Sequence, residues 1–333
     1  MRVLIVKLSS LGDVVHAMPV VHDLLAARPG ITVDWVVEPG FAPLVRRVDG
    51  IGEVIECALR RWRKAWWTAG VRAEWRAFRA RLQRVPYDAV IDLQGLTKSA
   101  VVARLAGGTR YGLGLRTDGS SWERPARWLV DVPITVPRRI HAVDRSRELV
   151  AQVLGAAVSG PPRYGLRAAV RPAAPGTAPP LMVFVHGTSR DDKLWPEADW
   201  ITLGRRLAEA GWQICLPRAG AAETARAAAL AQAIGPAATV WPEMALDVLV
   251  DRLGAAHGVI GVDSGLSHIA VALGRPHVQI YNFPTAWRTG PQPGHGHRHQ
   301  RSVQGRPAPA FDEVWAAWRA VADAAGLSAG SPP

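Results

Sequence analysis

The chain has 333 residues and a formal net charge of +12, and 48% of its residues are hydrophobic. This length fits two domains of ordinary size, and no apolar run approaches the roughly 18 residues that span a bilayer. The run at residues 3–6 is too short for a signal peptide, and Cys57 and Cys215 alone offer no disulfide framework, so we expect a reducing cytoplasm. The positive charge favours an anionic partner, such as nucleic acid, a nucleotide or an acidic membrane surface.

The first residues predict the opening of a doubly wound α/β domain. Residues 2–7 are typical of a strand, 9–13 (SSLGD) of a turn, 14–27 of an amphipathic helix and 31–37 of a second strand. The turn lacks the GxGxxG pattern of dinucleotide-binding domains. Asp13 lies at the start of the helix, where it is either a carboxylate that complements the helix dipole or a functional group.

Residues 60–84 have the most unusual composition. Four cations crowd the start of this segment: Arg60, Arg61, Arg63 and Lys64. Trp66 and Trp67 follow, and the spacing then predicts a helix over residues 71–82 with Trp75, Phe78 and Leu82 on one face. A charged run is usually a solvated face, but basic residues beside aromatic ones favour a boundary between water and an apolar phase. They also suit single-stranded nucleic acid.

The middle of the chain adds one more strand and a composition shift. Residues 87–93 (YDAVIDL) predict a strand, and 94–99 form the turn into a helix. His141 lies near the start of a helix that runs to about residue 154, as either a satisfied histidine or a ligand. Residues 168–180 (AAVRPAAPGTAPP) are rich in proline, alanine and glycine, which predicts a linker between two domains.

The second half shows the same alternation of predicted strands and helices. A strand at 181–185 leads into the loop HGTSRDDKLWP, where Thr188, Ser189 and Lys193 supply the hydroxyl groups and ammonium that bind phosphate. A solvated loop with an internal Asp–Lys pair would have the same composition. Glu223 is either a functional group or a first-turn acid of the helix that follows. The histidines of 295–299 could hold a metal, but a solvated loop is the favoured interpretation.

Residues 258–276 predict a strand, a tight turn and a helix. The turn is Asp263-Ser264-Gly265, and this arrangement directs free N–H groups and a positive helix end toward an anion. Asp263 would lie at the carboxyl edge of the strand, where open α/β sheets bind ligands. An ordinary N-cap role for Ser264 would give the same pattern. Residues 311–325 predict a final amphipathic helix.

Four separated blocks together resemble the lipopolysaccharide heptosyltransferases of glycosyltransferase family 9. They are VKLSSLGDVVHAMPV, RRWRKAWW, VHGTSRDDKLWP and GVDSGLSHIAVALGRP, and the resemblance runs from Met1 to about Trp318. The forms RRWRKAW and TSRDDKLWP favour the member that transfers the first heptose. The nearest alternative uses the same donor with an already heptosylated acceptor. The alternative from another class is a non-catalytic basic protein that binds nucleotides or nucleic acid.

The resemblance implies a GT-B fold, with two Rossmann-like α/β domains facing across a cleft. It implies an acceptor-binding domain at 1–167, a linker at 168–180, a domain that binds ADP-heptose at 181–310, and a helix at 311–327 that packs back on the first domain. It further implies inverting transfer of heptose to Kdo-modified lipid A on the cytoplasmic face of the inner membrane. No metal, other cofactor or nucleic-acid partner is implied.

The resemblance also assigns residues. Asp13 matches the general base, and Lys193 matches the cation that stabilises the leaving group. The implied donor-binding residues are Thr188, Ser189, Lys193, Glu223, Met244, Asp263, Ser264, Gly265, Leu266 and His268. The implied acceptor-binding residues are Ser10, Gly12, Arg60, Arg61, Arg63, Lys64, Gln94, Lys98 and His141. Residues 218–220 and 281–288 (YNFPTAWR) depart from the family pattern.

These residue types suit a displacement without a divalent ion. Departure of ADP builds negative charge on the diphosphate, which Lys193, the hydroxyl groups and a helix N-terminus can stabilise. The carboxylate of Asp13 can accept the proton of the acceptor hydroxyl. The cations of the 60–64 segment match lipid A phosphates and Kdo carboxylates.

Overall fold

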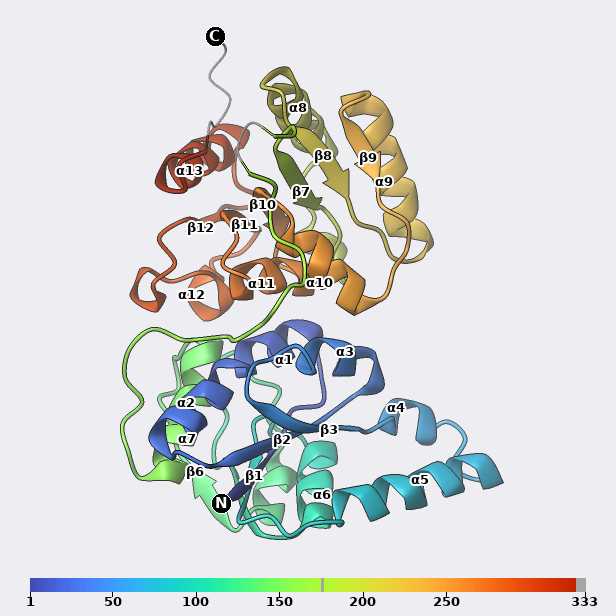
Figure 1. Cartoon of the computed structure of the whole chain (residues 1–333), viewed down its shortest axis with the longest axis vertical. Helices are drawn as coiled ribbons and strands as arrows, with labels where there is room; N and C mark the ends of the chain where they lie inside the picture. Colours follow the sequence, from blue (N-terminus) through green and yellow to red (C-terminus); the bar gives the residue numbers. More distant parts are fainter. Residues whose placement is uncertain (175–176, 328–333) are drawn as a thin grey trace. The chain divides into compact units, whose positions relative to one another are not determined.

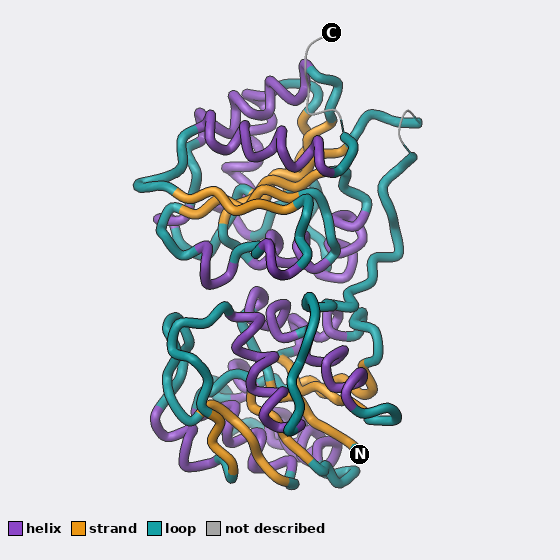
Figure 2. The backbone as a smooth tube through the Cα atoms, turned by 90° about the vertical axis from the view of Figure 1, so that its left-hand side faces the viewer, coloured by secondary structure: helices purple, strands orange, loops and turns teal. Residues whose placement is uncertain are grey.

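The computed structural model describes residues 1–174 and 177–327. The chain divides into two compact units, Met1–Leu166 and Arg167–Pro333, here called the first and second unit (Figure 1). Each unit has one six-stranded parallel sheet with helices on both faces, as Figure 2 shows. Among the described residues, none of the helices has the length and apolar character to cross a membrane.

The sheet of the first unit has the strand order β3-β2-β1-β4-β5-β6. Its strands are β1 Arg2–Val6, β2 Thr32–Val37, β3 Ile51–Glu56, β4 Ala89–Asp92, β5 Thr109–Leu113 and β6 Val132–Ile134. The central strands β1 and β4 are almost wholly buried because helices cover both faces. The strand order reverses between β1 and β4, and the loops that follow such strands are where open α/β sheets bind ligands.

The helices of the first unit follow the predicted pattern with one break. They are α1 Leu11–Ala17, α2 Pro19–Ala27, α3 Ala42–Val45, α4 Leu59–Trp62, α5 Ala69–Leu82, α6 Thr97–Ala106 and α7 Ala142–Leu154, with 3₁₀ turns η1 Pro39–Phe41 and η2 Arg124–Leu129. The single helix expected over 14–27 is split at Pro19, which lacks the N–H that a continuous helix requires. Phe78 and Leu82 of α5 are buried as predicted, and Trp75 packs against them.

The second unit repeats this topology. Its strand order β12-β11-β10-β7-β8-β9 is the same 3-2-1-4-5-6 order when its six strands are counted along the chain. The strands are β7 Leu181–Val185, β8 Gln213–Leu216, β9 Ala238–Val240, β10 Gly258–Val262, β11 His277–Tyr281 and β12 Gln300–Gln304. The helices are η3 Asp191–Lys193, α8 Glu197–Glu209, α9 Gly220–Ile234, α10 Leu246–Gly254, α11 Gly265–Ala272, α12 Ala286–Thr289, η4 Pro293–His295 and α13 Phe311–Ala324.

The last helix, α13, belongs to the second unit. Its apolar face, including Val314, Trp315 and Trp318, lies in the hydrophobic core of that unit, and the helix packs against β11, β12 and α8. Gly258 of β10 makes room for Trp318, since an added Cβ would lie 2.3 Å from the indole ring. The tryptophans of α13 complete the core of the second unit, and the expectation that this helix packs back on the first domain stays a prediction.

The segment expected to be a linker starts near the boundary between the two units, but part of it is hydrogen-bonded to the second unit. The backbone N–H of Ala169 donates to Asp251 at 2.7 Å, and the carbonyl of Ala173 lies 3.1 Å from Nε2 of His257. Residues 175 and 176 of this segment lie outside the described part of the chain. The described start of the segment therefore runs along α10 rather than freely between the units.

Candidate active site

The loop after β1 places Asp13 beside a buried lysine. Lys7 follows β1 directly, and its Nζ lies 3.7 Å from Oδ1 of Asp13 and donates to the carbonyl of Leu93 at 3.2 Å. Ser10 donates to Oδ2 of Asp13 through its backbone N–H (3.2 Å) and its Oγ (2.8 Å). Burial opposes ionisation of Asp13, but the Lys7 ammonium and the Ser10 hydrogen bonds outweigh it and lower its pKa to about 2. Asp13 is thus an ionised carboxylate that Ser10 and Lys7 keep in place, and its side chain remains 41% exposed.

A second carboxylate, Asp92 at the end of β4, supports the neighbouring loop. It accepts hydrogen bonds from the N–H groups of Gln94 and Gly95 and from Oγ of Ser99, at 2.9–3.2 Å. Burial nevertheless raises the pKa of Asp92 to about 6. Gln94, predicted to bind acceptor, is buried and accepts from the N–H of Leu8 at 2.7 Å. Its visible role is to join the loops after β1 and β4.

The basic cluster at 60–64 divides into two parts. Arg61 forms a bidentate ion pair with Glu74 of α5, and Glu74 also accepts from Nε1 of Trp62 at 2.7 Å. Arg61 therefore links α4 to α5 through this ion pair. Arg60, Arg63 and Lys64 instead line a cavity of about 680 Å³. The predicted Lys98, from the start of α6, lines the same cavity.

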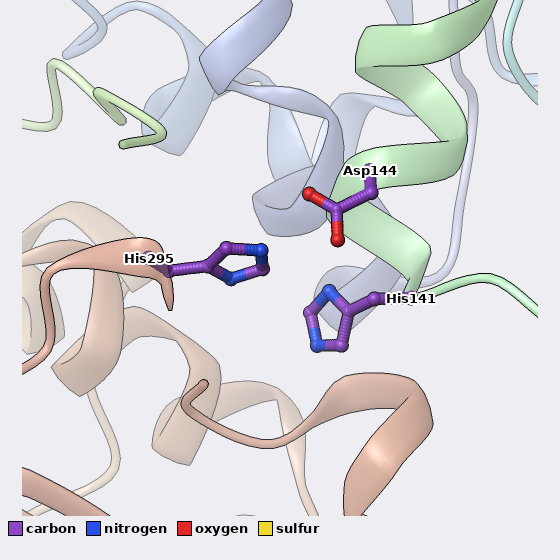
Figure 3. A group of neighbouring side chains, drawn as sticks. All are labelled: His141, Asp144 and His295. Atoms are coloured by element: carbon purple, nitrogen blue, oxygen red, sulfur yellow. The ribbon is translucent and has the colours of Figure 1, made fainter. Parts of the chain in front are cut away.

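His141 is the N-cap of α7. Its Nδ1 accepts from the N–H of Val143 at 3.2 Å, as expected of a helix-start histidine, and its role in acceptor binding stays a prediction. Figure 3 shows His141 and Asp144 projecting from the first turn of α7. His295, also drawn there, lies on η4 of the second unit.

Of the other predicted acceptor residues, Ser10 donates a hydrogen bond to Asp13, and Gly12 lies in the first turn of α1.

In the second unit, the loops after β7 and β10 and the helix α11 bring together a cation, a carboxylate and a histidine. Nζ of Lys193 lies 2.6 Å from Oδ2 of Asp263, and Nε2 of His268 lies 3.4 Å from Oδ1. Thr188 donates to the carbonyl of Asp263 at 3.3 Å. Burial opposes ionisation of Asp263, but the His268 hydrogen bond and the Lys193 charge hold its pKa well below its usual range. Lys193 therefore pairs with a residue 70 positions away rather than with the acids of its own loop.

The start of α11 has the features of an anion site. Ser264 occupies the N-cap position but makes no side-chain cap bond, and its buried Oγ has no hydrogen-bond partner among the described residues. The first N–H groups of a helix, here those of Gly265 and Leu266, have no partner within the helix. An unpaired hydroxyl, free N–H groups and the nearby ammonium of Lys193 together suit a phosphate group.

Glu223 lies against the glycine that follows His186. An added Cβ on Gly187 would lie 2.2 Å from Oε1 of Glu223, so this carboxyl packs directly on the glycine in the loop after β7. Burial raises the pKa of Glu223, and a backbone hydrogen bond at Ala219 opposes this. Ser189 is exposed on the loop after β7, and Met244 is half-buried before α10.

The family of the chain follows from its similarity to known proteins. The family model of glycosyltransferase family 9 (heptosyltransferase) matches residues 75–312. This chain belongs to glycosyltransferase family 9. It is therefore a glycosyltransferase, and the prediction of a GT-B fold is confirmed by its two parallel sheets and its structural neighbours.

Similar proteins cover nearly the whole chain. Lipopolysaccharide heptosyltransferase 1 of Escherichia coli K12 is 44% identical over 285 residues, covering 84% of this chain and 88% of that protein. The protein of the same name from Pseudomonas aeruginosa PAO1 is 43% identical over 292 residues, covering 87% and 81%. The solved structure of E. coli heptosyltransferase WaaC with ADP has a TM-score of 0.84 and 36% identity, covering 97% of this chain and all of that one. E. coli heptosyltransferase II, at 21% identity and a TM-score of 0.72, shares the fold.

Asn282 is a residue of this family 9 chain that the sequence did not single out. It is 6% exposed, and its Nδ2 donates to the carbonyls of Asp192 (3.0 Å) and Leu194 (2.8 Å), on either side of Lys193. It lies in the 281–288 segment that departs from the family pattern. Lys7 and Asp92 were missed as well, although each stands as a lone charged residue at the end of an apolar strand, which was the available signal.

Proposed function

We propose that this chain transfers heptose from ADP-heptose to Kdo-modified lipid A, with inversion at the anomeric carbon, in the synthesis of the lipopolysaccharide inner core. Its relatives at 42–44% identity are named lipopolysaccharide heptosyltransferase 1, and a solved relative is described with ADP. The observation that carries the proposal is the Lys193–Asp263 pair beside the unpaired Oγ of Ser264. This arrangement suits the diphosphate of a nucleotide sugar.

The donor half of the reaction follows from this charge arrangement. Before donor binds, Asp263 neutralises Lys193, and the arriving diphosphate competes for the ammonium. As the bond between the anomeric carbon and the diphosphate oxygen breaks, ADP keeps the electron pair. Lys193, Thr188, Ser189 and the start of α11 stabilise the added negative charge. Glu223 and Met244 are the proposed ribose and adenine contacts, and these groups supply the positive and hydrogen-bonding character without a metal.

Asp13 is the proposed general base. The oxygen of the acceptor hydroxyl attacks the anomeric carbon, and its proton passes to the Asp13 carboxylate as the new bond forms. A carboxylate with a pKa of about 2 is a weak base toward a free alcohol. The hydroxyl becomes far more acidic as it bonds to carbon, so the transfer is favourable only late in the step. Lys7 keeps Asp13 ionised and ready at neutral pH.

The acceptor side of the proposal rests on the basic cavity of the first unit. Arg60, Arg63, Lys64 and Lys98 would bind the acidic groups of the acceptor. The exposed Trp67 follows the cavity-lining Trp66 in the sequence and suits the interface of an anionic membrane. We therefore propose that the protein works on the cytoplasmic face of the inner membrane.

The test is a transfer assay with ADP-heptose and acceptors of increasing core length, read by mass spectrometry. Kdo-modified lipid A, made soluble by removal of its acyl chains, should gain one heptose. Preference for an already heptosylated acceptor would instead assign the chain to the alternative member of the family. Family membership favours both over the non-catalytic, nucleic-acid-binding alternative.

A further inference from the structure

The cavity beside α4 combines positive charge with aromatic walls. It has a volume of about 680 Å³ and is lined by five cationic and five apolar side chains. The described residues that line it include no acid. Its cationic residues are Arg60, Arg63, Lys64, Arg72 and Lys98. A site for a small inorganic anion would not need so much apolar wall, and a site for a neutral apolar molecule would not need five cations.

The apolar wall is rigid at its base. Trp62 is 7% exposed, meets Trp75 edge-to-face with ring centroids 5.6 Å apart, and packs on Phe78 at 5.3 Å. Its Nε1 donates to Glu74, which fixes the plane of the indole. Trp66, at the rim, is 66% exposed. The cavity therefore has a preformed aromatic base and a loose aromatic edge, so an apolar group that enters it loses contact with water without reordering the core.

The cations differ in their availability. Arg72 donates to the carbonyl of Trp67, and Nε of Arg60 lies 4.0 Å from Oε1 of Glu38. Within the described part of the chain, Arg63, Lys64 and Lys98 form no ion pair. These three are the ones that can bind an incoming acidic group without first breaking an internal contact.

We infer that this cavity binds an amphiphilic anion, holding a phosphate or carboxylate group at Arg63, Lys64 and Lys98 and the first part of an attached acyl chain against Trp62, Trp66 and Trp75. The inference rests on the proposed function and deepens it. The acceptor would be recognised through an acyl chain of its lipid part as well as through its acidic groups. The charge complementarity and the aromatic wall select one lipid chain bound inside the protein, rather than the surface of a bilayer.

A series of n-alkyl phosphates, from ethyl to octyl and below their micelle-forming concentrations, tests this. Their affinity for the full-length protein is measured by calorimetry and by inhibition of transfer to a fully deacylated acceptor. We expect the dissociation constant to fall by about fourfold for each methylene buried, the equivalent of ~0.8 kcal/mol, until the apolar wall is covered. Trp66→Ala should flatten this dependence on chain length. Arg63→Ala/Lys64→Ala should weaken every member of the series.

Trp67→Ala is the matched control, because Trp67 is equally exposed (60%) but does not line the cavity. It should keep the wild-type dependence on chain length. Affinities independent of chain length in the wild type would overturn the inference. Equal losses in Trp66→Ala and Trp67→Ala would also overturn it and would assign both residues to a membrane surface. Absence of transfer to the deacylated acceptor would count against the proposed function alone, because calorimetry still reports binding to the cavity.

Discussion

Nζ of Lys193 lies 2.6 Å from Oδ2 of Asp263, so the cation that we propose binds the donor is neutralised by a carboxylate of the same unit. A free lysine would attract any anion. A paired one yields only to a ligand that offers more negative charge than a carboxylate, together with hydrogen bonds to the neighbouring hydroxyl groups. A diphosphate meets both conditions.

Loss of the Lys193 ammonium should therefore damage both donor binding and turnover. We expect Lys193→Met to lower kcat by roughly 10²–10³-fold, as for the removal of one charge-stabilising donor from a transition state, and to raise the KM for ADP-heptose. The KM for acceptor should change little. Steady-state kinetics with each substrate varied in turn would show this, and a defect confined to the acceptor would contradict the assignment.

The Lys7 ammonium, together with the hydrogen bonds from Ser10, lowers the pKa of Asp13 against the effect of burial. The folded-state pKa of Asp13, about 2, lies below its ordinary value of 3.8, so the ionised form persists until the pH falls through about 2. The profile of kcat/KM should accordingly show no loss of the Asp13 base between about pH 5 and pH 8. In Lys7→Met the main opposing charge is gone, burial dominates, and the pKa should rise. The kcat/KM of the variant should then fall toward the acid end of the measured pH range. A profile unchanged in shape would show that Lys7 does not tune the base.

Asn282 should act on catalysis through Lys193. Replacement by Asp removes both donors to the carbonyls of Asp192 and Leu194, at roughly 0.5–1.5 kcal/mol for each hydrogen bond, and should lower kcat/KM for ADP-heptose by about tenfold. Gln300→Ala is the control, since its amide also donates to two carbonyls, those of Val271 and Arg275, without touching the loop of Lys193. In a Lys193→Met background the effect of Asn282→Asp should largely vanish. Full additivity would assign Asn282 a structural role only.

The packing of α13 can be tested by stability. Trp318 is fully buried, with its indole against Gly258 and edge-to-face on Trp212 at 5.5 Å. Trp318→Ala should lower the free energy of unfolding of the second unit by about 3–5 kcal/mol. Urea unfolding of the full-length protein, followed by circular dichroism, would report it. A loss below ~1 kcal/mol would mean that α13 adds little to this core.

The sequence predicted those elements whose signals are local. The strand at 258–262 and the helix after it could be read from an apolar run, a glycine turn and helical spacing, because burial between two helical layers imposes that pattern. The helix break at Met18 and Pro19 was missed because the apolar stripe continues through the proline. The packing of α13 into the core of the second unit was not predicted, since an amphipathic helix shows which of its faces is buried but not the core that buries it.

Site residues could be predicted where one short sequence segment contains several of them. They could not be predicted where the contact joins residues that are far apart in the sequence. Lys193 could be identified from its loop, but its pairing with Asp263 depends on β7 and β10 being neighbours in the sheet. The sequence does not distinguish Arg61 from Arg60 and Arg63, because its ion pair with Glu74 joins residues that are 13 positions apart. Asn282 lies in a segment noted only for its departure from the family pattern, because a single amide in a loop shows its role only through the carbonyls to which it donates.

Asp13 is the residue on which the proposed heptose transfer to a Kdo-bearing acceptor depends most. The most direct measurement is single-turnover transfer from ADP-heptose to deacylated Kdo-modified lipid A, comparing the wild type with Asp13→Asn, with ADP affinity measured by calorimetry on both. We predict one heptose added per acceptor by the wild type, a rate roughly 10²–10⁴-fold lower for Asp13→Asn, and equal ADP affinity. A near-normal rate in the variant, or no transfer to this acceptor by the wild type, would contradict the account.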